Sequence, residues 1–417
     1  MNKKLQKYLQ NRATISPWQI AGTSRTDFAA AIVIPALAER ENLPATIDRL
    51  CLNPSEYLAQ TLVVIVVNNR ADISAFQLDN NQKTINWLQS NPYPHLNLAW
   101  IDASSSGLEL PMKDGVGLAR KIGFDASLQL LDWKISPLLS SLDADTLVDR
   151  FYLATIFDHF ALSKNGAAVI PFRHQPSSNS EQEVAIRRYE LYLRSYLFGL
   201  QMAGSPYAYH SIGSAFACSA SAYVRAGGMN RRCGGEDFYF LQQLAKTSGL
   251  EVVNGTVVHP SPRFSNRVPF GTGKAVQSQV EDNVSLFQFV PVAGFELLKL
   301  WLDLISCQLD HSANQIILRV QRISPVLHEF LIELNFVQVW EKLQKNHSSR
   351  KQRLAAFHDW FDALRTRQLL TRSESNSNSS AEQVVAELLS WGRYPGTEKE
   401  IDQLELLEKL QGVGYYA

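Results

Sequence analysis

Five apolar runs in the first 172 residues most constrain the fold of this chain, because helical patterns separate them. Each run is rich in apolar and β-branched residues and short enough to be one buried strand rather than a helix. Continuous apolar strands that are each followed by a helix are typical of a largely parallel sheet covered on both faces. The sequence therefore predicts an α/β fold with strands over residues 29–35, 61–69, 96–102, 137–145 and 167–172.

The pattern changes after these strands. A predicted long helix, capped by Ser180 and Glu183, comes first. A Gly- and Ser-rich stretch and a Glu-Asp helix follow, and residues 250–260 read as a short hairpin. The remaining chain is almost entirely helical in pattern. Because 417 residues exceed one ordinary core, several domains are expected. We predict an N-terminal arm (1–27), an α/β domain (28–276) and an all-helical domain (277–417), with a mobile polar linker over 373–382.

Composition limits the partners that the chain can have. Forty basic residues balance forty acidic ones, so no net field attracts nucleic acid or anionic lipid. Basic residues are enriched locally only over 342–372. This indicates a solvated helix face, or at most a peripheral contact with a membrane or phosphate-rich partner. The four cysteines lack metal or disulfide spacing, and the N-terminal segment lacks the apolar core of a signal peptide. These features predict a cytoplasmic protein.

Two carboxylates follow the fourth apolar run, in the segment SLDADTLV. Ligands of open α/β sheets bind beyond the carboxyl ends of the strands. Alternate residues of a strand share a side, so Asp143 and Asp145 are predicted to point the same way. Such a pair suits a hard divalent ion, Mg²⁺ or Mn²⁺, that keeps positions open for phosphates. The alternative is a helix cap beside a solvated turn, which accounts for one of the two aspartates.

Two other phosphate-binding folds are excluded by their motifs. The segment GVGLAR lacks the third glycine of a dinucleotide-binding turn and does not follow a strand. The segment PFGTGKAV lacks the upstream glycine of a P-loop and has Ala275 where Ser or Thr should reach the metal. The chain is therefore predicted to be neither a Rossmann dehydrogenase nor a P-loop NTPase.

The order of the motifs over residues 28–275 resembles family 2 glycosyltransferases of the GT-A fold, and more narrowly a bacterial subgroup. The resemblance is carried by five segments: AAIVIPALAERENLPATIDRL, LVVIVVNNRAD, GVGLARKIGFDAS, SSLDADTLVD and GGEDFYFLQQL. The chain departs from the family at Asn68 and Asn69, where an Asp is usual. It also lacks the Gln-x-x-Arg-Trp motif and membrane helices of processive polymerases.

The resemblance implies a donor site for a nucleoside-diphosphate sugar. Asp145 would be the direct ligand of a divalent metal, which would stabilise the leaving diphosphate. Asp143 would contact ribose or a metal-bound water, and His259 is either a further metal ligand or a structural histidine. The other residues assigned to the donor nucleotide are Pro35, Glu39, Asn68, Asn69, Lys113 and Arg120.

Acceptor activation is assigned to a pair of carboxylates that opens a helix behind two glycines. By its place in the family motif, Asp237 is the expected base for the acceptor hydroxyl, with Glu236 oriented beside it. Acidic residues in a first helical turn are also favourable through the helix dipole, which is the competing interpretation. The loop bearing Arg263, Arg267 and Lys274 is predicted to close over the diphosphate, against the alternative of a solvated basic loop.

The leading prediction is a metal-dependent glycosyltransferase that acts on a hydroxyl acceptor of unknown identity, with inversion at the anomeric carbon. One alternative is a retaining GT-A enzyme that glycosylates a small acid such as a glycerate derivative. Another is a non-catalytic binding module on the same scaffold. A nucleotidyltransferase is disfavoured because no Gly-rich loop follows the first strand. The helical domain could border the acceptor site or form a homodimer contact.

Overall fold

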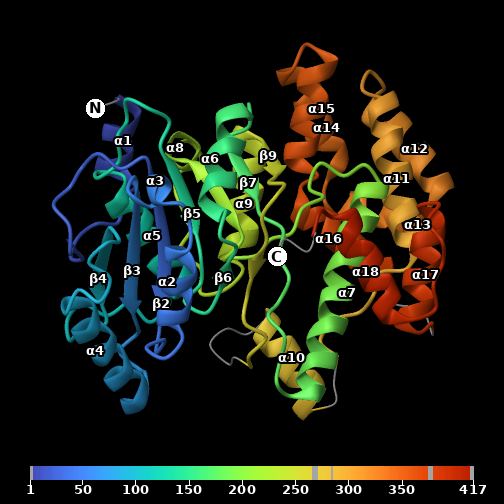
Figure 1. Cartoon of the computed structure of the whole chain (residues 1–417). Coiled ribbons are helices and arrows are strands. Elements are labelled where there is room, and N and C mark those ends of the chain that lie inside the picture. Colours follow the sequence, from blue (N-terminus) through green and yellow to red (C-terminus); the bar gives the residue numbers. More distant parts are fainter. Residues whose placement is uncertain (1–2, 265–270, 283–284, 374–378, 414–417) are drawn as a thin grey trace. The chain divides into compact units, whose positions relative to one another are not determined.

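The computed structural model describes residues 3–264, 271–282, 285–373 and 379–413. The chain divides into two compact units, each described here by itself (Figure 1). Unit 1 comprises residues 1–186, 211–282 and 411–417, and unit 2 comprises residues 187–210 and 283–410.

Unit 1 contains an eight-stranded mixed sheet in the order β1-β4-β3-β2-β5-β8-β7-β9. The central strands β4, β3, β2 and β5 run parallel, as predicted from the apolar runs. β8 is antiparallel to both β5 and β7. The strands are β1 (Ile20–Ala21), β2 (Ala30–Ala36), β3 (Thr61–Asn68), β4 (Leu98–Ala103), β5 (Leu138–Ser141), β7 (Ala167–Val169), β8 (Phe216–Ser219) and β9 (Leu250–Val252).

Every residue of β2 and β3 is buried. Because successive strand residues point to opposite faces, both faces of the sheet are covered at its centre. α5 packs on β2 and β3, and α4 packs on β3 and β4. The helices of this part are α1 (Lys3–Asn11), α2 (Leu43–Cys51), α3 (Ser55–Leu58), α4 (Ala75–Gln89), α5 (Val116–Ser127), α6 (Tyr152–Leu162), α8 (Ala220–Ala226), α9 (Glu236–Ser248) and α10 (Thr272–Glu281).

The predicted hairpin over 250–260 is wrong. β9 pairs in parallel with β7, whereas β10 (Val258–His259) pairs with β6 (Leu147–Val148) in a separate two-stranded sheet. The two short strands therefore find distant partners instead of each other. As a result, His259 lies opposite Leu147, two residues after Asp145.

The N-terminal helix α1 is anchored to the rest of unit 1 by a buried polar cluster. The Tyr8 hydroxyl donates to Asp125 (2.7 Å) and accepts from the Lys121 ammonium (2.9 Å). Tyr223 also donates to Asp125, at 2.8 Å. Gly228 has φ of +80°, and a Cβ there would lie 1.9 Å from the Tyr8 hydroxyl oxygen. The first turns of the chain thus complete the packing of α5.

We expect Tyr8→Phe to lower the free energy of unfolding by about 1–3 kcal/mol, because buried Asp125 and Lys121 each lose a partner. Urea unfolding followed by tryptophan fluorescence measures the change. Tyr93→Phe is the matched control, since the Tyr93 hydroxyl donates to Asp48 at 2.6 Å in an exposed position. Equal effects of the two variants would contradict a special role for the buried cluster.

Unit 2 is helical, which confirms the predicted fold class of an α/β part with a helical C-terminal part. Ser caps recur: Ser312, Ser349 and Ser380 each form a capping box with the Gln three residues later. The helices are α11 (Val292–Cys307), α12 (Ala313–Ile323), α13 (Pro325–Glu333), α14 (Phe336–Asn346), α15 (Arg350–Trp360), α16 (Ala363–Ser373), α17 (Ala381–Trp391) and α18 (Glu400–Leu410).

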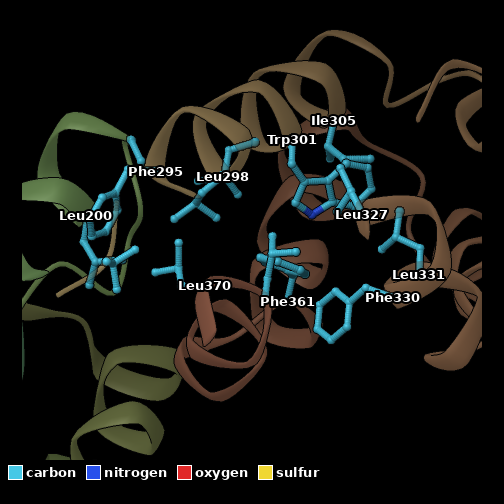
Figure 2. Packing of buried hydrophobic residues seen from close by; sticks show 14 of the residues in the cluster. Leu200, Phe295, Leu298, Trp301, Ile305, Leu327, Phe330, Leu331, Phe361 and Leu370 are labelled. Atoms are coloured by element: carbon cyan, nitrogen blue, oxygen red, sulfur yellow. The ribbon is translucent and has the colours of Figure 1, made fainter. Parts of the chain in front are cut away.

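Large apolar side chains form the core of unit 2 (Figure 2). Trp301 is fully buried and makes edge contacts with Phe336, Phe357 and Phe361. Leu191, Phe198 and Leu200 from α7 (Ser180–Met202) belong to the same core. Residues 187–210 therefore pack with the helical unit, whereas the sequence prediction places them in the α/β domain.

The predicted linker over 373–382 is only partly described. Residues 374–378 lie outside the described residues, α16 ends at Ser373, and Ser380 caps α17. Among the helices that the structure describes, none has both the length and the apolar character that crossing a bilayer requires.

Candidate active site

The Asp-x-Asp segment lies in a turn and not in a strand. β5 ends at Ser141, and the Thr146 N–H donates to the Asp143 carbonyl at 3.1 Å. The predicted strand over 137–145 therefore extends four residues too far at its carboxyl end, and the alternation of strand side chains does not apply to the two aspartates. Because β2, β3, β4 and β5 are parallel, the turn shares one edge of the sheet with the residues that follow the other three strands.

Arg120 joins this turn to the start of α9. Its Nε donates to the Ser141 hydroxyl at 3.0 Å, and its two terminal nitrogens pair with Asp143 and Glu236. The side chain is only 3% exposed. Gly213 permits this position, since a Cβ there would lie 2.5 Å from an Arg120 terminal nitrogen. Arg120 thus lies between the two acidic motifs, as a buried counter-charge for both.

A close helix contact positions the acidic start of α9. A Cβ at Gly117 would lie 2.5 Å from the Arg232 carbonyl and 2.9 Å from the Glu236 Cβ, so only glycine fits at this point of α5. Gly235 before the helix has φ of +66°, a left-handed conformation that glycine adopts without strain. The side chain of Asn230 then donates to the Glu236 carbonyl at 2.7 Å.

Asp237 has the electrostatic character of a base that works near neutral pH. Its carboxylate accepts from the Phe238 N–H at 2.7 Å. Burial, followed by the neighbouring charge of Glu236, raises the pKa of Asp237 to about 7, although Arg120 acts in the opposite direction. Glu236, the neighbour whose charge contributes to this shift, pairs directly with Arg120.

A second arginine neutralises the other aspartate of the turn. The Arg263 Nε lies 2.6 Å from an Asp145 carboxylate oxygen, and a terminal nitrogen of Arg263 pairs with Glu39. The Glu39 side chain is only 4% exposed and also accepts from Asn42 at 2.8 Å. Arg263 therefore brings together Glu39, three residues beyond the end of β2, and the turn after β5.

His259 faces an acidic partner that the sequence did not indicate. Its Nε2 lies 3.3 Å from an Asp149 carboxylate oxygen, and its Nδ1 lies 3.1 Å from the Arg173 carbonyl. Gln175 donates to the carbonyls of both Asp145 (2.8 Å) and His259 (2.7 Å). This amide holds the β6–β10 pair beside the Asp-x-Asp turn.

The last residue of β3, Asn68, and the following Asn69 have buried side chains that support the sheet edge. Asn68 donates to the Val66 carbonyl at 3.0 Å, and Asn69 accepts from Asn81 at 2.8 Å. The Oδ1 of Asn81 in turn accepts from the Ala38 N–H at 2.8 Å. These amides thus order the backbone between β2 and Glu39, and their role as nucleotide contacts stays a prediction.

The remaining predicted site residues that the structure describes are not seen in contact with the acidic turn. Pro35 is buried within β2, opposite Val66. Lys113 is exposed in the loop before α5, and Lys274 is half-buried in α10. Arg267 lies outside the described residues. Of the loop assigned to the diphosphate, Arg263 is the residue seen in contact with the acidic turn.

The predicted metal ligands do not form a metal site in this arrangement. Carboxylate and imidazole groups are suitable ligands for Mn²⁺ by chemistry. However, Asp143 pairs with Arg120, Asp145 with Arg263 and His259 with Asp149. Across residues 3–264, 271–282, 285–373 and 379–413, no three His, Cys, Asp or Glu side chains gather as a metal site would require.

Fold and site together define an α/β protein with an acidic sheet edge whose carboxylates are paired with buried or half-buried arginines. No protein-family model matches the chain, and no characterised protein sequence matches it. Several solved structures are similar to the chain. The chain is similar to S. aureus TarS 1–349, at 12% identity and a TM-score of 0.38, over 94% of this chain and 93% of that one.

Two further similar structures are complexes with a nucleotide sugar. TarS 1–349 in complex with UDP-GlcNAc is 12% identical, with a TM-score of 0.39, over 94% of this chain and 93% of that one. The mannosyltransferase PcManGT from Pyrobaculum calidifontis, in complex with GDP-Man and Mn²⁺, is 13% identical. It matches with a TM-score of 0.36 over 99% of this chain and 94% of that one.

Proposed function

We propose that the chain is a glycosyltransferase that moves a sugar from a nucleoside diphosphate to a hydroxyl acceptor. The observation that carries this proposal is the junction at Arg120. There, one guanidinium joins Asp143, in the turn after β5, to Glu236, beside the candidate base Asp237. Segments more than 90 residues apart thus meet at the carboxyl edge of the parallel strands, where α/β folds bind their ligands.

In the proposed reaction, the acceptor hydroxyl oxygen forms a bond to the anomeric carbon of the donor sugar. The bond from that carbon to the diphosphate oxygen breaks, and the nucleoside diphosphate leaves with the bonding electron pair. Asp237 takes the proton of the acceptor hydroxyl as the new bond forms. Attack from the side opposite the leaving group inverts the anomeric configuration.

The donor site is assigned to the edge formed by Glu39, Asn68, Asn69, Asp143 and Asp145. A divalent ion would supply Lewis-acid stabilisation of the leaving diphosphate when bound. No step above depends on it, because the predicted ligands have protein partners in this arrangement. The residues of this chain would then contribute orientation of the donor and the proton acceptor.

Binding of a nucleoside diphosphate to the wild-type chain tests the proposal most directly. We expect UDP or GDP, or the sugars UDP-GlcNAc or GDP-Man, to raise the melting temperature, because ligands that bind only the folded state stabilise it by mass action. The matched monophosphates UMP and GMP serve as controls and should shift it less. If no diphosphate shifts it, with or without Mn²⁺, the proposal is wrong.

The stereochemical part of the proposal has its own test. NMR of the anomeric proton in the first-formed product should show the configuration opposite to that of the donor. Retention would remove Asp237 from the role of base and would favour the retaining alternative.

A further inference from the structure

Arg263 holds a position that matters for any cation at this site. It pairs with Asp145 through Nε and with Glu39 through a terminal nitrogen, so one guanidinium bridges two carboxylates from different strand ends. The Arg263 side chain is 33% exposed, whereas Glu39 is 4% and Asp145 is 17% exposed. Pairing in such partly desolvated surroundings is stronger than on an open surface.

The two carboxylates cannot be left without a counter-charge at low cost. Glu39 is almost fully removed from water, and a buried carboxylate that loses a counter-charge is strongly unfavourable. Either a guanidinium or a metal ion can supply the positive charge. Both groups use the same carboxylate oxygens, so the occupancy of one opposes that of the other.

We propose that Arg263 is a resident counter-cation of Asp145 and Glu39, and that it competes with divalent cations for these two carboxylates. The competition accounts for the disagreement between the Asp-x-Asp motif and the geometry. The motif carries oxygen ligands suited to a metal. However, Asp145, which is predicted to bind the metal directly, is already paired with Arg263.

The proposal has a further consequence that rests on the proposed function. A diphosphate offers Arg263 anionic oxygens as alternative partners. A nucleoside diphosphate should therefore draw the guanidinium away from Asp145 and strengthen binding of a divalent cation to the wild-type chain. When Arg263 is absent, this strengthening should be much smaller.

Mn²⁺ titration without nucleotide, followed by the EPR signal of the free ion, tests the competition. Arg263→Gln should bind Mn²⁺ at least about tenfold more tightly than wild type. Arg263→Lys keeps a positive charge and should stay within about threefold of wild type. Arg372→Gln is the matched control, because Arg372 also pairs with a glutamate, Glu333, at an exposure of 36%.

The result that would overturn the proposal is equal Mn²⁺ affinity of wild type and Arg263→Gln. Tighter binding that persists in the double variant Asp145→Asn/Arg263→Gln would also overturn it, since the ion would then bind elsewhere. Folding of each variant is checked by circular dichroism and melting temperature. If Arg263→Gln is unstable, Mn²⁺ should restore its melting temperature, and absence of that rescue counts against the proposal.

A repeat of the titration with UDP or GDP separates the two proposals. If Arg263→Gln binds Mn²⁺ tightly but neither nucleotide changes the Mn²⁺ affinity of wild type, the competition stands and the donor site is contradicted. If the nucleotides bind but Arg263→Gln gains no affinity for Mn²⁺, the proposed function stands and the competition is wrong.

Discussion

Replacing Arg120 by methionine is expected to lower the free energy of unfolding of unit 1 by about 3–5 kcal/mol. Arg120 is 3% exposed and serves as the counter-charge of both Asp143 and Glu236. Its removal leaves Glu236, which is itself 5% exposed, as a buried carboxylate without that partner. Methionine has a similarly long, unbranched side chain. The loss of stability therefore reflects the missing charge more than a change in packed volume.

Urea unfolding monitored by circular dichroism measures this loss. Lys83→Met is the matched control in the same unit, because Lys83 pairs with Asp79 on the exposed surface of α4. Its unfolding midpoint should stay close to that of wild type. A loss for Arg120→Met no larger than that of the control would show that Arg120 does not hold the two acidic segments together.

The triple variant Asp143→Asn/Glu236→Gln/Arg120→Met tests whether Arg120 acts through its charge. Removing the paired charges of a buried network together costs far less than removing one of them. We therefore expect this variant to recover a large part of the lost stability, while glycosyl transfer is not recovered. That separation would distinguish a charge-balancing role from a purely steric one.

Asp237→Asn is expected to lower the rate of glycosyl transfer by about 10²–10⁴-fold, which is the usual contribution of a positioned base. Asparagine has nearly the same shape but cannot take the acceptor proton. The melting-temperature shift caused by UDP or GDP should persist, because Asp237 is assigned to the acceptor and not to the donor. Loss of nucleotide binding together with activity would contradict this assignment.

The same variant has a pH-dependent effect on stability. The pKa of Asp237 is raised from the ordinary aspartate value of 3.8 to about 7 in the folded chain. The folded state therefore holds a proton that the unfolded state releases, and ionising Asp237 destabilises the fold as the pH rises from about 4 to 7. Above pH 7 this destabilisation is complete, and below pH 4 it is absent.

Asp237→Asn should accordingly raise the melting temperature at pH 8 by about 2–6 °C and change it little at pH 4. In the wild type, the rate of transfer should increase as the pH passes through about 7, because the base must be ionised. Scanning calorimetry at the two pH values and a pH–rate profile measure these effects. A stability gain that is equal at both pH values would mean that ionisation of Asp237 is not its cause.

The central sheet could be predicted because its signal is local. The runs behind β2 and β3 are buried at every residue, so composition alone marks them as strands. β8 was not predicted, since it lies within a stretch of small residues and its position depends on pairing with β5 and β7. The false hairpin has the same origin, because β9 and β10 are close in sequence but pair with distant strands.

The candidate site was predicted as a set of residues but not as a set of contacts. Asp143, Glu236 and Asp237 could be identified from their motifs. Their connection through Arg120 could not, because it depends on how tightly α5 approaches α9 at Gly117. The sequence carried little signal of this contact, because Gly117 is only the second residue of α5 and does not stand out as a helix-interior glycine would.

Asp149 and Gln175 were missed for a different reason. Neither belongs to a recognisable motif, and each acquires its role through the pairing of β6 with β10. The pairing of Asp145 with Arg263 was also not predicted. The sequence prediction placed a metal ion at Asp145 and the donor diphosphate at Arg263. Ion pairs between residues more than 100 positions apart leave no local pattern that a sequence can reveal.

The discontinuity of the two units affects how the chain can be divided. Unit 2 is built from residues 187–210 as well as 283–410, and α7 begins in one unit and ends in the other. A break after residue 282 would separate Leu191, Phe198 and Leu200 from the helices that bury them. A fragment that begins after residue 282 would therefore lack part of its own core, so unit 2 is not encoded as one contiguous module.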